Sequence, residues 1–130
     1  MKTFKKITLI SILLIGFFVK AQTKTEDNFI GKWLTEDKTT TVEFYKEKNM
    51  YYGKVVKCTI AKTKKGEQSV GQIMIIEMKL KGKNLEGGTV KDIDSYKEYD
   101  AKFIPIDYNK IKLKVTVMLF SHSEVWTRVN

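Results

Sequence analysis

The sequence of 130 residues is poor in four residue types that often carry chemistry or constrain a fold: it has one cysteine, one histidine, one arginine and one proline. The single cysteine excludes an intramolecular disulfide, so an apolar core must stabilise the fold. A lone histidine, His122, does not supply a zinc site, which draws on several histidine or cysteine ligands. The only proline, Pro105, is expected to end the strand that contains it.

The remaining candidates for reactive or metal-binding groups have simpler interpretations. Cys58 shares the two-residue period of Val56 and Ile60, which predicts a buried packing residue rather than a reactive thiol. Asp92 and Asp94 supply two carboxylates, far fewer than the roughly six to eight oxygen ligands of calcium, and are expected in a solvated turn. We therefore expect no metal site and no cofactor.

Recognisable catalytic arrangements are also missing from the sequence. Ser121 and Ser123 flank His122, but adjacent positions on a strand or turn point in different directions, so this spacing does not make a nucleophile with its base. The pair Gly87-Gly88 lacks the glycine spacing and the following helix of a phosphate-binding loop. The sequence therefore favours a protein that is not an enzyme.

One long apolar run is present, at the N-terminus. Three lysines precede the apolar residues 7–19, and this run is shorter than the roughly 20 residues that span a membrane. The pattern predicts a signal peptide over residues 1–21, cleaved after Ala21, and export to the periplasm or the outside of the cell. Lys20 beside the cut is unusual, which leaves an uncleaved anchor as the alternative. No cysteine is available there for lipidation.

Residues 22–130 are enough for one domain. Removing residues 1–21 takes away four lysines and no acids, which lowers the formal charge from +9 to +5. This mildly basic balance fits a solvated lysine-rich surface or an anionic partner surface in the cell envelope. Export argues against nucleic acid as a partner, and the oligomeric state is left open.

After the N-terminal segment the chain consists of short runs rich in Val, Ile, Thr, Tyr and Phe, separated by polar clusters about every ten residues, which is typical of an all-β fold. Several runs alternate apolar and polar side chains, so each has one buried face. The eight expected strands are residues 31–35, 41–44, 50–60, 72–81, 84–91, 99–103, 111–117 and 123–129.

Short connections predict that neighbouring strands pair as antiparallel hairpins. Gly82-Lys83 and Asp107-Tyr108-Asn109 suit tight turns, and residues 61–71 are expected to form a mobile, lysine-rich loop at one rim. Eight such strands form either a sandwich or a closed barrel. We favour an up-and-down barrel, because no long crossover is present and closure of the first strand onto the last removes both sheet edges.

The two ends of the chain carry residues suited to that closure. Gly31 and Trp33 lie on the first strand, and Arg128, the sole arginine beside 23 lysines, lies on the last. If the two strands pair, the planar guanidinium can stack on the indole ring and satisfy nearby carbonyls, which lysine does less well. We interpret these three residues as structural. By parity Glu124 shares the inner face with Trp126 and Arg128, and it either pairs with Arg128 or lines the rim.

This Gly-x-Trp and basic-residue pairing resembles the signature of the calycin superfamily of lipocalin and fatty-acid-binding barrels. Over roughly residues 29–129 the order is similar to the exported bacterial family called domain of unknown function 2147. The departures are the short lysine-rich loop 61–68, residues 93–95 and residues 121–122. The resemblance implies a lipocalin-like barrel and export, and no established catalytic residues. The matching pieces are Ile30-Gly31-Lys32-Trp33, Val42-Glu43-Phe44-Tyr45, Tyr52-Gly53-Lys54-Val55-Val56, Glu86-Gly87-Gly88-Thr89-Val90, Asp92, Tyr99, Leu113 and Trp126-Thr127-Arg128-Val129.

A ligand of such a barrel would lie in its interior, toward which every second side chain of each strand points. An eight-stranded barrel either fills with side chains or holds one small ligand. We therefore carry two hypotheses, a binder of a small apolar or amphipathic molecule and a filled structural or interaction module of the cell envelope. The candidate ligand-binding residues are Phe44, Met74, Ile76, Met78, Tyr99, Phe103 and Val115, and parity adds Val42, Ala101, Leu113 and Val117 to the inward face.

Overall fold

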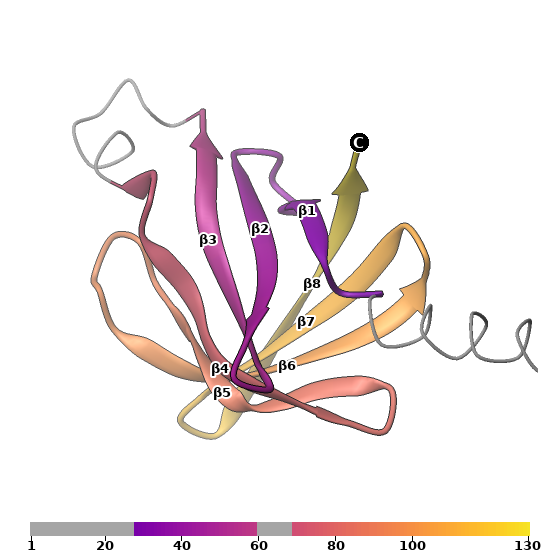
Figure 1. Ribbon diagram of the computed structural model, residues 1–130. Coiled ribbons are helices and arrows are strands. Elements are labelled where there is room, and N and C mark those ends of the chain that lie inside the picture. The colour runs from indigo at the N-terminus through magenta and orange to yellow at the C-terminus, as the bar shows by residue number, and fades with distance from the viewer. Residues whose placement is uncertain (1–27, 60–68) are drawn as a thin grey trace, which may run out of the picture.

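A computed structural model describes residues 28–59 and 69–130, and eight strands follow one another along this part of the chain (Figure 1). The expected signal peptide and most of the expected rim loop lie outside the described residues. Within them, no helix has the length and apolarity to cross a membrane. The strands are β1 (Gly31–Leu34), β2 (Thr40–Glu47), β3 (Met50–Cys58), β4 (Ile73–Lys81), β5 (Asn84–Lys91), β6 (Glu98–Asp107), β7 (Lys110–Val117) and β8 (Phe120–Val129).

The strands form a closed barrel in sequence order, and each pairs antiparallel with its neighbour. The last strand returns to the first, with Trp33 opposite Arg128. The predicted all-β, up-and-down, eight-stranded barrel is therefore confirmed, and the sandwich is excluded. Because neighbouring strands run in opposite directions, the β1–β2, β5–β6 and β7–β8 connections lie at one end of the barrel, together with the end of β3 and the start of β4. We call this end the mouth.

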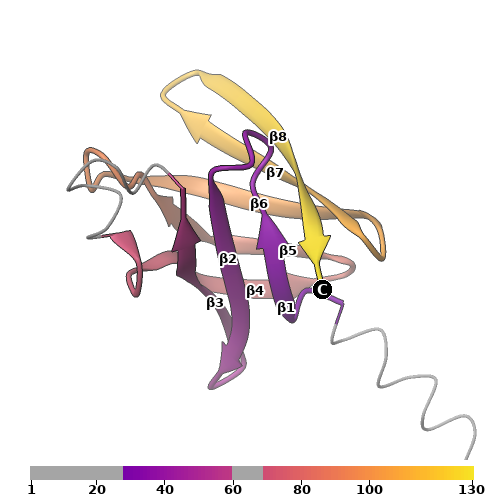
Figure 2. The ribbon, with the colours of Figure 1, turned by 90° about the horizontal axis from the view of Figure 1, so that it is seen from above.

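Closure of the barrel is shorter than expected. β1 has four residues and pairs with β8 only from Lys32 opposite Val129 to Leu34 opposite Thr127. Nearer the mouth, the backbone N–H of Val125 donates to the carboxylate of Glu36 at 3.3 Å instead of to a strand. The expectation that closure removes both edges was thus wrong for residues 120–126 of β8, which have no partner on β1. Figure 2 shows the β7–β8 hairpin as an arm at one side of the barrel.

The end of the barrel opposite the mouth is packed with large side chains. The ring centroid of Phe44 lies 5.1 Å from that of Phe103, and Phe103 lies 5.4 Å from Trp126, both in edge-to-face geometry. Trp33 is fully buried beside them, and its indole N–H donates to the carbonyl of Phe29 at 2.9 Å. Edge-to-face aromatic contacts add stability beyond the apolar area that they bury. The half of the interior opposite the mouth is therefore filled with side chains.

The alternation of inward and outward side chains is interrupted along β4. Glu77 has a φ of +52°, and Ile75 and Met78, three residues apart, are both fully buried. Ile76 pairs with Thr89, whose hydroxyl donates to Glu98 on the exposed outer face. The expectation that Ile76 points inward was therefore wrong, because the irregularity at Glu77 shifts the two-residue period.

Pro105 does not end its strand. β6 continues to Asp107, and its ladder with β7 shifts register between Pro105 and Asp107. The ladder with β5 stops at Phe103, so the last residues of β6 run along an edge, where a proline without an N–H is tolerated.

Candidate ligand cavity at the barrel mouth

A cavity of about 510 Å³ opens at the mouth, above the packed aromatic core. Its floor and walls are mainly apolar side chains from five strands. This volume lies within the range of small-molecule sites, roughly 300 to 1,000 Å³. The residues that form the floor and walls are Cys58, Met74, Val90, Tyr99, Leu113, Val115 and Val117.

The candidate residues from the sequence divide into three groups. Met74, Tyr99 and Val115 line the cavity. Phe44, Met78 and Phe103 are buried in the core cluster. Ile76 lies outside the barrel interior, as described above. Of the other parity assignments, Leu113 and Val117 line the cavity, whereas Val42 and Ala101 belong to the core.

The rim of the cavity consists mainly of polar residues, which come from the connections between strands and from β5 and β8. Residues of the β1–β2 and β5–β6 connections, such as Asp37, Asp92 and Ile93, were not expected in a site. No sequence pattern joins these distant segments. The signal that could have found them is the strand count, because in a barrel of hairpins alternate connections meet at the same end.

Asp37 is held by its own connection. Its Oδ1 accepts hydrogen bonds from the hydroxyl of Thr35 at 2.7 Å and from the backbone N–H of Thr39 at 3.0 Å. Desolvation raises the pKa of Asp37, but the hydrogen bonds from Thr35 and Thr39 outweigh it, so the pKa lies below its ordinary value. The rim therefore carries an ionised carboxylate at neutral pH.

Asp92 and Asp94 lie in the exposed β5–β6 connection. Asp92 accepts from the backbone N–H of Asp94 at 3.1 Å and from the hydroxyl of Ser95 at 3.0 Å. This arrangement is an Asx-type turn, which local hydrogen bonding explains without a ligand. Within residues 28–59 and 69–130, no three acidic, histidine or cysteine side chains gather in a way that could hold a metal ion.

Glu124 lines the cavity and accepts a hydrogen bond from the indole N–H of Trp126. Among the described residues, no ion pair joins it to Arg128, so of the two alternatives the structure shows the rim position. His122 lines the cavity on the same strand and is exposed. Cys58 is buried in the cavity wall at the mouth end of β3, with its Sγ 3.8 Å from the hydroxyl of Thr40.

The residues interpreted as structural meet at the barrel seam, away from the cavity. The guanidinium carbon of Arg128 lies 4.3 Å from the ring centroid of Trp33 and 4.2 Å from that of Tyr108. Its nitrogens donate to the carbonyls of Ile30 at 2.9 Å and of Tyr108 at 2.8 Å. A Cβ on Gly31 would lie 2.8 Å from Nη1 of Arg128, so the guanidinium occupies the space that glycine leaves open.

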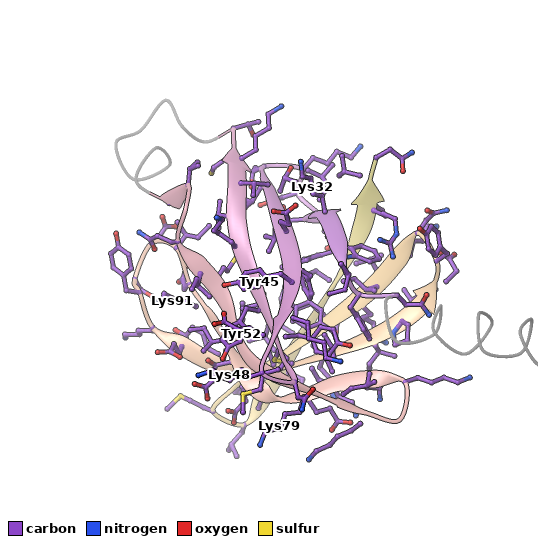
Figure 3. The ribbon with its side chains drawn as sticks, in the orientation of Figure 1. Lys32, Tyr45, Lys48, Tyr52, Lys79 and Lys91 are labelled. Atoms are coloured by element: carbon purple, nitrogen blue, oxygen red, sulfur yellow. The ribbon has the colours of Figure 1, made fainter. Side chains whose placement is uncertain are left out.

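A shallower hollow lies on the outer face. Tyr45 and Tyr52 stack there at 5.7 Å, and Figure 3 shows them side by side across β2 and β3. Tyr52, Ile76 and Lys91 help to line the hollow, of about 620 Å³. Because this hollow is more open than the cavity at the mouth, we regard the mouth as the candidate site.

Comparison with known proteins identifies the family of this chain. Residues 31–128 match a bacterial family described as "Uncharacterized protein conserved in bacteria (DUF2147)". The chain belongs to this family. The DUF2147 match runs from the glycine of the seam, Gly31, to its arginine, Arg128. The family resemblance predicted from the sequence is thus confirmed.

A solved structure has the same fold as this DUF2147 protein. It is the protein HP1028 from Helicobacter pylori, described as belonging to the lipocalin family, with a TM-score of 0.66 and 13% sequence identity. The match covers 78% of this chain and 83% of HP1028. At this identity the likeness establishes a lipocalin-like fold. The comparison with curated proteins finds no match.

Proposed function

We propose that this DUF2147 protein is a non-enzymatic binder of a small amphipathic molecule, held in the cavity at the barrel mouth. One observation carries the proposal: a cavity of about 510 Å³ with an apolar floor and a polar rim stands above a packed core. Sites for small molecules commonly combine apolar walls with a few polar groups that fix orientation.

The arrangement of the lining indicates how such a ligand would lie. Its apolar part would contact Met74, Leu113 and Val115, and its polar part would meet rim groups such as Asp37 and Lys91. The likeness to a lipocalin supports the proposal at the level of fold. A completely filled barrel would leave no room for a ligand, so the cavity favours this function over the filled module.

We also propose that the protein works after export, because residues 1–21 have the pattern of a signal peptide. Fractionation of the bacterium tests this proposal. Intact mass of the protein recovered from the periplasm or the medium should fit a chain that begins at Gln22. Recovery of the whole chain from the cytoplasm alone would contradict export.

Binding can be tested with a neutral fluorescent probe, N-phenyl-1-naphthylamine. We expect the wild-type protein to bind it saturably and Val115→Trp, which fills the cavity, to weaken binding at least about tenfold. The matched control is Thr116→Trp, because Thr116 is the next residue of β7 and is exposed. Equal binding by all three proteins, or no binding by the wild type, would rule out a ligand site in this cavity. Native mass spectrometry of protein from the envelope would then identify the natural ligand.

A further inference from the structure

The tip of the β7–β8 hairpin exposes an unbroken run of large apolar side chains. Met118 is 92% exposed, Leu119 is 95% exposed and Phe120 is 79% exposed, and Val117 before them is 39% exposed. Scattered apolar side chains are normal on a protein surface, but contiguous ones commonly mark a surface that binds something. The hairpin tip therefore requires an explanation that the fold does not give.

The backbone of this tip makes its composition more unusual. Val117 pairs with Phe120, so Met118 and Leu119 form a two-residue turn, and Met118 has a φ of +56°. Glycine, asparagine or aspartate normally takes such a position, because other side chains are strained there. The corresponding turns of the other hairpins are polar or glycine-containing: Lys48-Asn49, Gly82-Lys83 and Tyr108-Asn109. The apolar residues at 118–120 thus do not serve the turn itself.

Behind the tip, the outer face of the hairpin is basic. Lys110, Lys112 and Lys114 alternate along β7, and the β8 residues opposite them are Thr127, Val125 and Ser123, none of which is charged. On the other side, the ladder with β6 sets Lys102 opposite Lys114 and Ile104 opposite Lys112. On the β6 side two carboxylates lie beside this stripe, Asp107 opposite Lys110 at the end away from the tip and Asp100 opposite Thr116. The hairpin therefore combines an apolar tip with a lysine stripe.

We propose that this hairpin docks the protein on an anionic lipid bilayer, with Met118, Leu119 and Phe120 inserted at the headgroup boundary and the lysine stripe against the headgroups. A projecting tip does not offer the concave or flat surface that most protein partners fill, whereas a bilayer accepts it. Apolar side chains in the interface and nearby lysines on anionic headgroups are the two contributions that hold peripheral proteins on membranes. The proposal is independent of a ligand in the cavity.

The proposal also agrees with the pairing at the tip. Lipid does not satisfy backbone groups, so only residues whose strand bonds are made, or those that stay at the level of the headgroups, can enter it. Phe120 pairs with Val117 and closes the hairpin. Ser121 and Ser123, which follow it, pair with β7 on one side only, and their other side is an edge of β8 without a partner on β1. Insertion should therefore be shallow and end at Phe120.

The test is co-sedimentation of the protein with vesicles of phosphatidylcholine, with or without phosphatidylglycerol. We expect binding to the mixed vesicles, weakened at least about tenfold by Leu119→Ser with Phe120→Ser. Each Lys→Gln change in the stripe should weaken binding about fivefold, and added salt should do the same. The matched control is Ile106→Ser, which removes an exposed apolar side chain of β6 at the end of the barrel opposite the mouth. Intact mass must show the same N-terminus in every preparation, so that residues 1–21 cannot cause a difference.

A second measurement reports the tip directly. The emission of a Phe120→Trp variant should shift to the blue when mixed vesicles are added, and a Lys83→Trp variant, in the exposed β4–β5 turn, should not shift. Equal vesicle binding by the wild type and the double serine variant would overturn the proposal, as would no binding by the wild type. A dimer in vesicle-free solution that the double serine variant abolishes would also overturn it, because the tip would then belong to a contact between two copies.

Discussion

At the scale of single residues, the barrel seam depends on one side chain that no other residue type replaces. Arg128 stacks between Trp33 and Tyr108 and donates to carbonyls of the chain before β1 and of the β6–β7 turn. A guanidinium is planar and has five donors, so it can stack and form hydrogen bonds at once. Because β1 has only three pairs with β8, these contacts supplement a short ladder.

Arg128→Lys should lower the free energy of unfolding by about 2 kcal/mol, since lysine loses most of the two stacks and all but about one of the hydrogen bonds. Urea denaturation measures this effect as a lower midpoint with an unchanged slope. The control is Lys32→Ala, an exposed change on the paired strand. An unchanged midpoint for Arg128→Lys would show that the seam does not need the guanidinium.

Two glycines of the β4–β5 hairpin, Gly82 in its turn and Gly88 on β5, should respond very differently to alanine. A Cβ on Gly88 would lie 2.2 Å from the carbonyl oxygen of Ile76 and 2.6 Å from Sδ of Met78, and backbone cannot give way cheaply. Gly82 has a φ of +61° but nothing within 4 Å. Gly88→Ala should therefore cost at least about 3 kcal/mol, against about 1 to 2 kcal/mol for Gly82→Ala. Circular dichroism during thermal unfolding compares the two, and equal losses would contradict the close packing at Gly88.

At the scale of elements, the sequence was sufficient for the strands and insufficient for their irregularities. The two-residue alternation and the turn residues predict eight antiparallel strands, because a sheet with one buried face requires an apolar side chain at every second position. The change of face at Glu77 has no corresponding pattern in the sequence, so the prediction that Ile76 points inward is wrong. Most of the rim was not predicted, because Asp37 and Asp92 come from the β1–β2 and β5–β6 connections, which only the closed barrel brings together.

The β1–β2 connection carries a pH-dependent contribution. The pKa of Asp37 is lowered below its ordinary value of 3.8, so its contribution to stability is present above that value and is lost as the pH falls through the lowered pKa. Asp37→Asn should therefore be less stable than the wild type at neutral pH, and the two should converge toward about pH 3. Urea midpoints measured across this range test the expectation. A difference that stays constant or grows on acidification would contradict it.

At the scale of the whole molecule, the barrel interior is divided into a filled half and an open half, and this division separates stability from binding. Phe103 lies in the filled half, so Phe103→Ala should cost about 3 to 5 kcal/mol. Val115 borders the cavity and already has partial exposure, so Val115→Ala should cost less than about 1 kcal/mol.

The same division predicts how a bound molecule changes stability. A probe present at about one hundred times its dissociation constant should stabilise the wild type by about 2.7 kcal/mol, because it binds only the folded barrel. Val115→Trp should remain folded and show no such gain, since its side chain takes the place of the probe. Thermal unfolding with and without N-phenyl-1-naphthylamine measures both effects, with Thr116→Trp as the control that keeps the gain. If Val115→Trp gained as much as the wild type, the probe would be bound elsewhere, and the open half of the barrel would not be the site.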